Sequence, residues 1–197
     1  RQTDVNGDWE GAGGEAGEGM GEAAGLPRLA LEGGSDLAQG RHEAAEKKAR
    51  EALATTLEAE ADPVAFAALH VHLGEVLLAR GAKDDARAMG MRAIEIDPVN
   101  HGAFALLREI DEPALEEARS YEILLEGFLQ GAPEVGFYKS YQVKAGDAEQ
   151  ALQKIMVFES LADPESIRVE ESGELDFDLG PRTGVYSSSG YAFFDRD

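Results

Sequence analysis

The stretch LGEVLLARGAKDDARAMGMRAIEIDP, residues 73–98, decides the first half of the fold, because its small residues recur earlier in the chain. Four positions match at a constant offset of 41 residues. The two matched sets are Gly33, Gly40, Ala45 and Ala52, and Gly74, Gly81, Ala86 and Ala93. A fixed offset across several positions predicts two copies of one supersecondary unit.

The small residues predict how each unit packs. Two antiparallel helices approach closely only where side chains are short, so Gly74 and Ala86 are expected at a helix crossing. Gly81 is expected in the turn between the helices, where glycine can adopt a positive φ. Ala93 lets the second helix pack on the next pair, and Pro98 ends that helix. A buried stripe at helical spacing is supplied by Leu69, Leu73, Val76 and Leu77.

Residues 73–98 resemble the tetratricopeptide repeat family, in their small residues and in the final proline. The resemblance covers residues 28–112 and is weaker outside the second copy. His70 stands where the family usually has a large aromatic residue. Residues 101–111 resemble the first helix of a third pair, and residues 113–119 are the candidate for a short second helix.

The resemblance implies a concave groove, lined by the first helix of each pair, that binds peptides or partner helices. This groove lacks the basic clamp with which some family members hold acidic peptides. It therefore suits an apolar or basic protein segment and would repel a carboxylate. The alternative is that the chain's own C-terminal domain covers the groove. The groove positions are Ala68, Val71, Glu75, Leu78 and Ala79 in the second copy and Gly102, Ala105 and Glu109 in the third.

The first 27 residues are rich in Gly, Ala and Glu, a composition that favours disorder because little apolar surface can be buried. Acidic and amide residues there follow part of a calcium-loop spacing, but Trp9 takes the position that requires glycine. No strand precedes the glycines, which disfavours a phosphate-binding loop. The calcium-loop positions are Asp4, Asn6, Asp8 and Glu15.

Residues 113–197 change from helical to alternating periodicity and predict a second, small domain of the α+β class. Lys139 is the exception to the alternating apolar set of residues 137–144. Gly190 is expected to mark a bulge or kink in the last predicted strand. Asp147 is predicted to cap a helix, with Gln150 as its capping-box partner. The predicted order ββαββ has strands at 121–126, 137–144, 167–171 and 185–194, with residues 127–136 joining the first two.

Charge and composition exclude several classes of function. The chain has 39 acidic and 18 basic residues, a net charge of −21, which argues against binding nucleic acid or an anionic membrane surface. It has no cysteine. No apolar run is long enough to span a membrane and no signal peptide opens the chain, so a cytoplasmic location is expected, although the start at Arg1 weakens that expectation.

No pattern of catalytic, cofactor-binding or metal-ligating residues emerges. His70 and His72 lie two apart on a helix and point to different faces. The serines at 187–189 lack the glycine pattern of a nucleophile elbow. Residues 170–178 are expected to form an exposed acidic hairpin or loop. The aromatic residues of the second domain are expected in its core, with an exposed partner-binding sheet face as the alternative.

Three hypotheses of function follow. The first is a non-enzymatic scaffold or adaptor that captures a protein partner on the groove or on a sheet face. The second is an acidic neutralising protein, of the kind that protects against a toxin, whose carboxylates cover a basic surface. The third is an enzyme with a site between the domains, which requires a deep pocket holding a carboxylate or histidine of perturbed pKa. The oligomeric state stays open.

Overall fold

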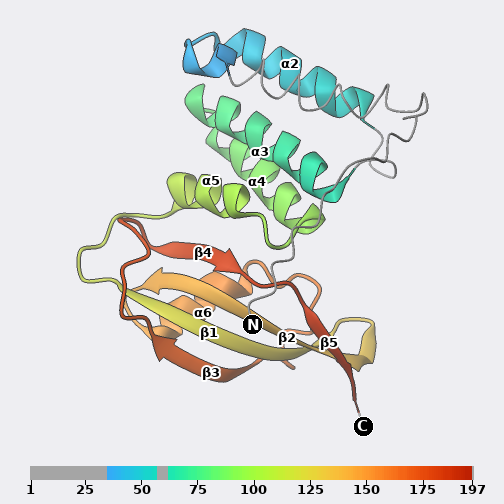
Figure 1. Cartoon of the computed structure of the whole chain (residues 1–197), viewed down its shortest axis with the longest axis vertical. Helices are drawn as coiled ribbons and strands as arrows, with labels where there is room; N and C mark the ends of the chain where they lie inside the picture. The colour runs from blue at the N-terminus through green and yellow to red at the C-terminus, as the bar shows by residue number, and fades with distance from the viewer. Residues whose placement is uncertain (1–34, 57–61, 197) are drawn as a thin grey trace, which may run out of the picture.

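The computed structural model describes residues 35–56 and 62–196, and it confirms an α+β fold with helices first and a sheet second. After a helical turn at residues 35–38, the chain forms α2 (His42–Thr55), α3 (Pro63–Ala79), α4 (Lys83–Ile96) and α5 (His101–Asp111). These helices stack in order towards the sheet, and α5 lies beside it (Figure 1).

The predicted helix crossing is confirmed at Gly74 and Ala86. A Cβ atom on Gly74 would lie 3.2 Å from the carbonyl oxygen of Ala86 and 2.4 Å from Cδ2 of Leu106, so only glycine fits unchanged. Gly40 and Gly81 occupy equivalent turns and have positive φ angles of 73° and 81°. Gly33 lies outside the described residues.

The helix boundaries follow from capping residues and prolines. Asp62 caps α3 by accepting a hydrogen bond from the backbone N–H of Val64, and Pro63 takes the first helical position. The predicted helix at residues 113–119 is wrong. That segment instead crosses to the sheet, where the Pro113 carbonyl accepts a hydrogen bond from the backbone N–H of Thr183.

The second half is an antiparallel sheet with one helix on it. Its elements are β1 (Arg119–Leu129), β2 (Ala132–Ala145), α6 (Ala148–Met156), β3 (Arg168–Glu174), β4 (Gly184–Ser188) and β5 (Ala192–Asp195). The strand order is β3-β1-β2-β4, and β5 pairs with the other end of β2. The Asp147 carboxylate caps α6 by accepting from the backbone N–H of Gln150, as predicted.

Two connections differ from the prediction. Residues 127–136 are not a loop, because β1 and β2 stay paired until Leu129 and Ala132 and turn through Gly131, whose φ is 122°. Gly127 and Gly136 lie inside the strands, where the aromatic rings of Phe137 and Phe194 fill the space that a side chain would need.

The last predicted strand is interrupted at residues 189–191 and forms two strands, β4 and β5. At the interruption the Ser189 hydroxyl accepts a hydrogen bond from the backbone N–H of Ser140. Residues 172–174, expected in an exposed hairpin or loop, extend the predicted strand and belong to edge strand β3, whose seven residues are all exposed.

One hydrophobic core crosses the boundary at residues 112–113. Phe104 and Leu107 of α5 share it with Ile123 of β1 and Tyr141 of β2. The two halves are also joined by hydrogen bonds, because Arg182 donates to the Glu112 carbonyl at 2.8 Å and the Ser188 hydroxyl to the Pro98 carbonyl at 2.7 Å. The helical and sheet segments are therefore fastened together by polar contacts as well as by apolar packing.

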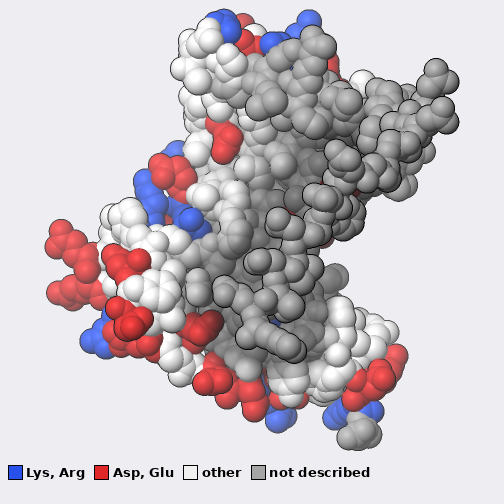
Figure 2. Space-filling model, in the orientation of Figure 1, with Lys and Arg blue, Asp and Glu red and all other residues white. Residues whose placement is uncertain are grey.

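Acidic side chains are numerous on the surface of the sheet segment, in the lower part of Figure 2. Residues 113–197 contain 17 acidic and 7 basic residues. Within the described residues, no helix is both long enough and apolar enough to cross a membrane.

Candidate functional site

The predicted groove residues lie on α3 and α5, two helices that contact each other. The two helices meet where Val71 lies against Gly102, since a Cβ atom on that glycine would be 3.3 Å from a Val71 methyl group. Val71 itself is 8% exposed and Leu78 is partly buried, so both support the face from below. The exposed members are Ala68, Glu75, Ala79, Gly102, Ala105 and Glu109. We call these six residues the small-residue face.

The sheet segment reaches one end of the small-residue face. Arg182 binds the carboxylate of Glu109 through two contacts of 3.0 Å. The alanines of the face remain exposed, and so does Glu75, which lies 3.7 Å from the His72 ring. The chain's own second half therefore engages Glu109 and leaves the rest of the face accessible among the described residues.

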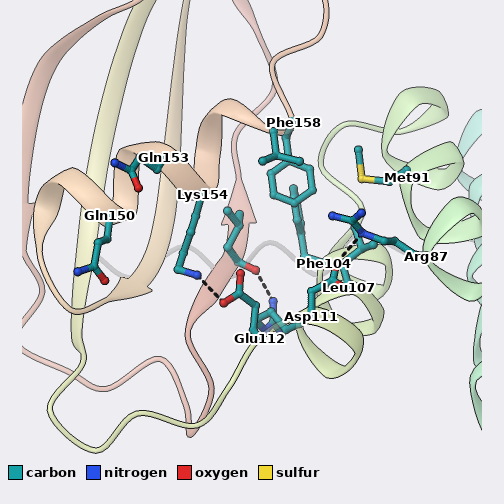
Figure 3. A pocket seen from close by; sticks show the side chains of 13 residues that line it. Arg87, Met91, Phe104, Leu107, Asp111, Glu112, Gln150, Gln153, Lys154 and Phe158 are labelled. Carbon is teal, nitrogen blue, oxygen red and sulfur yellow. Dashed lines mark hydrogen bonds and ion pairs between the residues drawn. The ribbon is translucent and has the colours of Figure 1, made fainter. Parts of the chain in front are cut away.

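A second candidate site is a cleft of about 450 Å³ between α4 and α5 on one side and α6 on the other. Figure 3 shows Arg87 and Met91 on the α4 side and Gln150, Gln153 and Lys154 on the α6 side. The small-residue face contributes nothing to its lining. A volume of this size is within the range, roughly 300–1,000 Å³, of small-molecule sites.

The floor of the cleft is apolar. Phe104 and Phe158 meet edge to face, with ring centroids 5.2 Å apart and an interplanar angle of 82°. Leu107 is buried beside them and Met91 is partly buried. At the edge, Val157 is 53% exposed although it is a large apolar residue. A ligand that covered this surface would gain free energy by removing it from water.

Ion pairs form the rim. The Arg87 guanidinium binds the Asp111 carboxylate at 2.6 Å, and the Lys154 ammonium binds the Glu112 carboxylate (Figure 3). Glu112 also accepts a hydrogen bond of 2.7 Å from the Thr183 hydroxyl. These carboxylates therefore already have partners within the chain.

Arg108 differs from Arg87 and Lys154, the other two cations that line the cleft. It donates to the Val185 carbonyl and lies 3.8 Å from the ring centroid of Tyr186. No carboxylate among the described residues pairs with it. Burial lowers the pKa of this guanidinium because the charged form is taken out of water.

A buried polar cluster lies under the sheet, next to the core. Lys139 and Glu159 are 1% and 3% exposed and form an ion pair of 3.1 Å. Both Glu159 oxygens also accept from phenols, one from Tyr141 and the other from Tyr191 at 2.9 Å. Burial, and then the neighbouring Glu159 charge, raise the pKa of both tyrosines, while burial lowers the pKa of Lys139.

The Lys139–Glu159 cluster left a signal in the sequence, and the cleft did not. Lys139 interrupts an alternating apolar set on β2, and such an interruption is the signal of an inward charge that requires a partner. The cleft left none, because its lining residues come from four elements between residues 87 and 185 and none breaks a local pattern. Sequence reasoning found neither site.

His70 and Ser187, two of the residues considered for chemistry, have structural partners. The Nδ1 atom of His70 lies 2.9 Å from the Phe66 carbonyl oxygen inside α3. The Ser187 hydroxyl donates to Gln142 on the neighbouring strand. Within residues 35–56 and 62–196, no group of three His, Asp or Glu side chains could hold a metal ion. The calcium-loop positions lie outside the described residues.

No family model matches the chain, and neither curated proteins nor solved structures provide a match.

Proposed function

We propose that this chain is a non-enzymatic scaffold or adaptor that binds a protein partner on the small-residue face of α3 and α5. The observation that carries the proposal is the exposure of Ala68, Ala79 and Ala105 on two contacting helices whose other faces are buried. Short side chains let the backbone of a partner helix or extended segment approach closely, which increases the contact area for each residue bound.

The chemistry of the face defines the partner. Glu75 is exposed in the middle of it, whereas Glu109, at the end next to the sheet, is already bound by Arg182. The chain as a whole carries a net charge of −21, which would steer a basic molecule towards it. The partner is therefore a segment with small or apolar side chains at the contact and a Lys or Arg placed to meet Glu75.

The experiment uses a photo-crosslinking amino acid in the full chain. Placed singly at Ala68 or at Ala105, it is expected to capture the same protein from cells of the source. Placed at Ala88, which is exposed on α4 and outside the face, it should not. Glu75→Lys should reduce the capture at both positions, whereas Asp84→Lys, a charge reversal on α4, should not.

Two results would contradict this assignment. Equal capture of the same protein at Ala88 would mean that it does not dock on this face. Capture that is unchanged by Glu75→Lys would mean that the partner does not read the acidic side chain at the centre of the face.

A second candidate function, neutralisation of a basic surface, is favoured by the acidic sheet. Glu122, Glu171 and Glu174 line a shallow cavity of about 270 Å³, and edge strand β3 is exposed along its whole length. Association through this surface should slow strongly with added salt, because screening weakens steering between opposite charges. Binding that depends on the small-residue face should depend less on salt, so association rates measured at several salt concentrations separate the two candidates.

A further inference from the structure

Among the residues that the structure describes, the charges around the cleft between α4, α5 and α6 do not balance. Three cations, Arg87, Arg108 and Lys154, face two carboxylates, Asp111 and Glu112. Two of the cations are paired with these carboxylates, and Arg108 is left without one. The cleft therefore has one excess positive charge inside a chain whose net charge is −21.

The carboxylates of Glu109 and Glu112, close to Arg108 in the sequence, cannot supply the missing charge, because other side chains hold them. Glu109 is bound by Arg182, and Glu112 by Lys154 and the Thr183 hydroxyl. A guanidinium remains charged at physiological pH and has five N–H donors, of which the Val185 carbonyl uses one. Taking such a group partly out of water is costly unless an anion meets it.

The position of Arg108 is set by its contacts with the sheet. The Tyr186 ring supports the guanidinium 3.8 Å from its centroid, and the hydrogen bond to Val185 holds one of its nitrogens. A guanidinium that is already oriented loses little conformational entropy when an anion binds. The remaining donors belong to a group that lines the cleft, beside the apolar floor of Phe104 and Phe158.

We propose that the cleft binds a small amphiphilic monocarboxylate. Its carboxylate pairs with Arg108, and its hydrocarbon part covers Phe158, Met91 and Val157. A single negative charge is favoured over a phosphate, because Asp111 and Glu112 on the rim would repel a second charge. The planar carboxylate also matches the fork of guanidinium donors. This site is separate from the small-residue face, so the two proposals can fail independently.

The first test is calorimetric titration of the full chain with octanoate, next to 1-octanol and octylammonium as neutral and cationic probes of equal chain length. Octanoate is expected to bind at least about tenfold more tightly than either. Arg108→Met should remove that preference, and Arg168→Met, which changes an exposed arginine of β3, should not. Equal affinity for octanoate and 1-octanol would overturn the proposal.

The second test locates the ligand through methionine methyl groups observed by NMR. Octanoate should shift the methyl signal of Met91, which lines the cleft, and leave that of Met89, which packs among the helices. Absence of a Met91 shift at saturating octanoate would show that the cleft is not the site.

A further variant guards against loss of folding in Arg108→Met. Val157 is 53% exposed at the edge of the cleft, so Val157→Glu places a carboxylate there with little effect on packing. It should weaken octanoate binding about tenfold by charge repulsion and leave 1-octanol binding nearly unchanged. Equal loss for both probes would mean that charge does not govern this site.

Discussion

Two cations of this protein, Lys139 and Arg108, are removed from water in different ways. Lys139 is almost fully buried under the sheet, and the chain surrounds it with Glu159 and with the rings of Tyr141 and Tyr191 at 5.0 and 4.1 Å from its ammonium. Arg108 is half-buried at the edge of a cleft and has a carbonyl and an aromatic ring but no carboxylate. Burial lowers the pKa of both cations.

The difference shows how to separate a structural charge from one that is available for binding. The buried charges of Lys139 and Glu159 pair with each other, and both Glu159 oxygens also accept from phenols, so the cluster needs no ligand. Arg108 has no carboxylate partner among the described residues and lines an open volume of about 450 Å³. Removal of the two charges should therefore lower the free energy of unfolding by unequal amounts.

The largest effect is expected for Glu159→Gln. It leaves Lys139 buried without a counter-ion and should lower the free energy of unfolding by about 3–5 kcal/mol, measured by urea denaturation. Glu149→Gln, at an exposed position in the first turn of α6, should change stability by less than about 0.5 kcal/mol. The double variant with Lys139→Met should recover much of the loss, and a single-variant loss below about 1 kcal/mol would contradict the proposed role of the pair.

Alkaline pH should expose the same cluster. The pKa of Tyr141 and of Tyr191 is raised in the folded state, so each phenol keeps a proton that the unfolded chain releases above about pH 10. This stability is fully present below that pH and is lost above it, by up to about 2.7 kcal/mol per pH unit for two protons. The pKa of Lys139 is lowered in the folded state, so this residue makes stability rise with pH. That rise ends at the ordinary lysine pKa, about 10.4.

Urea denaturation at a series of alkaline pH values measures that slope. Tyr141→Phe or Tyr191→Phe should each reduce it by about half. Stability that is independent of pH above 10 would show that these phenols ionise freely in the folded protein.

Close apolar packing should give an intermediate effect. Gly74→Ala improves helix propensity by up to about 1 kcal/mol, but the new methyl group meets the Ala86 backbone and Leu106. We expect a net loss of about 1–2 kcal/mol in the free energy of unfolding. Gly102→Ala, whose new Cβ atom would lie no closer than 3.3 Å to its nearest neighbours, should cost less stability than Gly74→Ala. A stabilising Gly74→Ala would mean that the helices do not need glycine at their crossing.

The smallest effect is expected for Arg108→Met, about 1 kcal/mol, because it removes one hydrogen bond and one contact with an aromatic ring and leaves no carboxylate unpaired. Thermal unfolding compared with that of Lys139→Met measures the contrast directly. A loss as large as that of Lys139→Met would show that Arg108 is a structural charge, not one held ready for an anion.

The sequence by itself determined the local features of this protein. The offset of 41 residues located two equivalent glycine turns and the crossing of Gly74 with Ala86, because backbone freedom and side-chain size act within one helix pair. Alternation predicted the strands, and the cap at Asp147 predicted the helix between them. The placement of residues 127–136 in a loop was wrong. Gly127 and Gly136 lie in strands because the rings of Phe137 and Phe194 fill the space of a side chain, and local sequence does not reveal those rings.

Only the tertiary structure decided where charges meet. Glu159 follows α6 and reaches Lys139 on β2, and Tyr191 joins them because the chain is interrupted between β4 and β5. The cleft is likewise assembled from α4, α5, α6 and β4. Such contacts depend on how whole elements pack, and neither residue spacing nor local propensity carries that information.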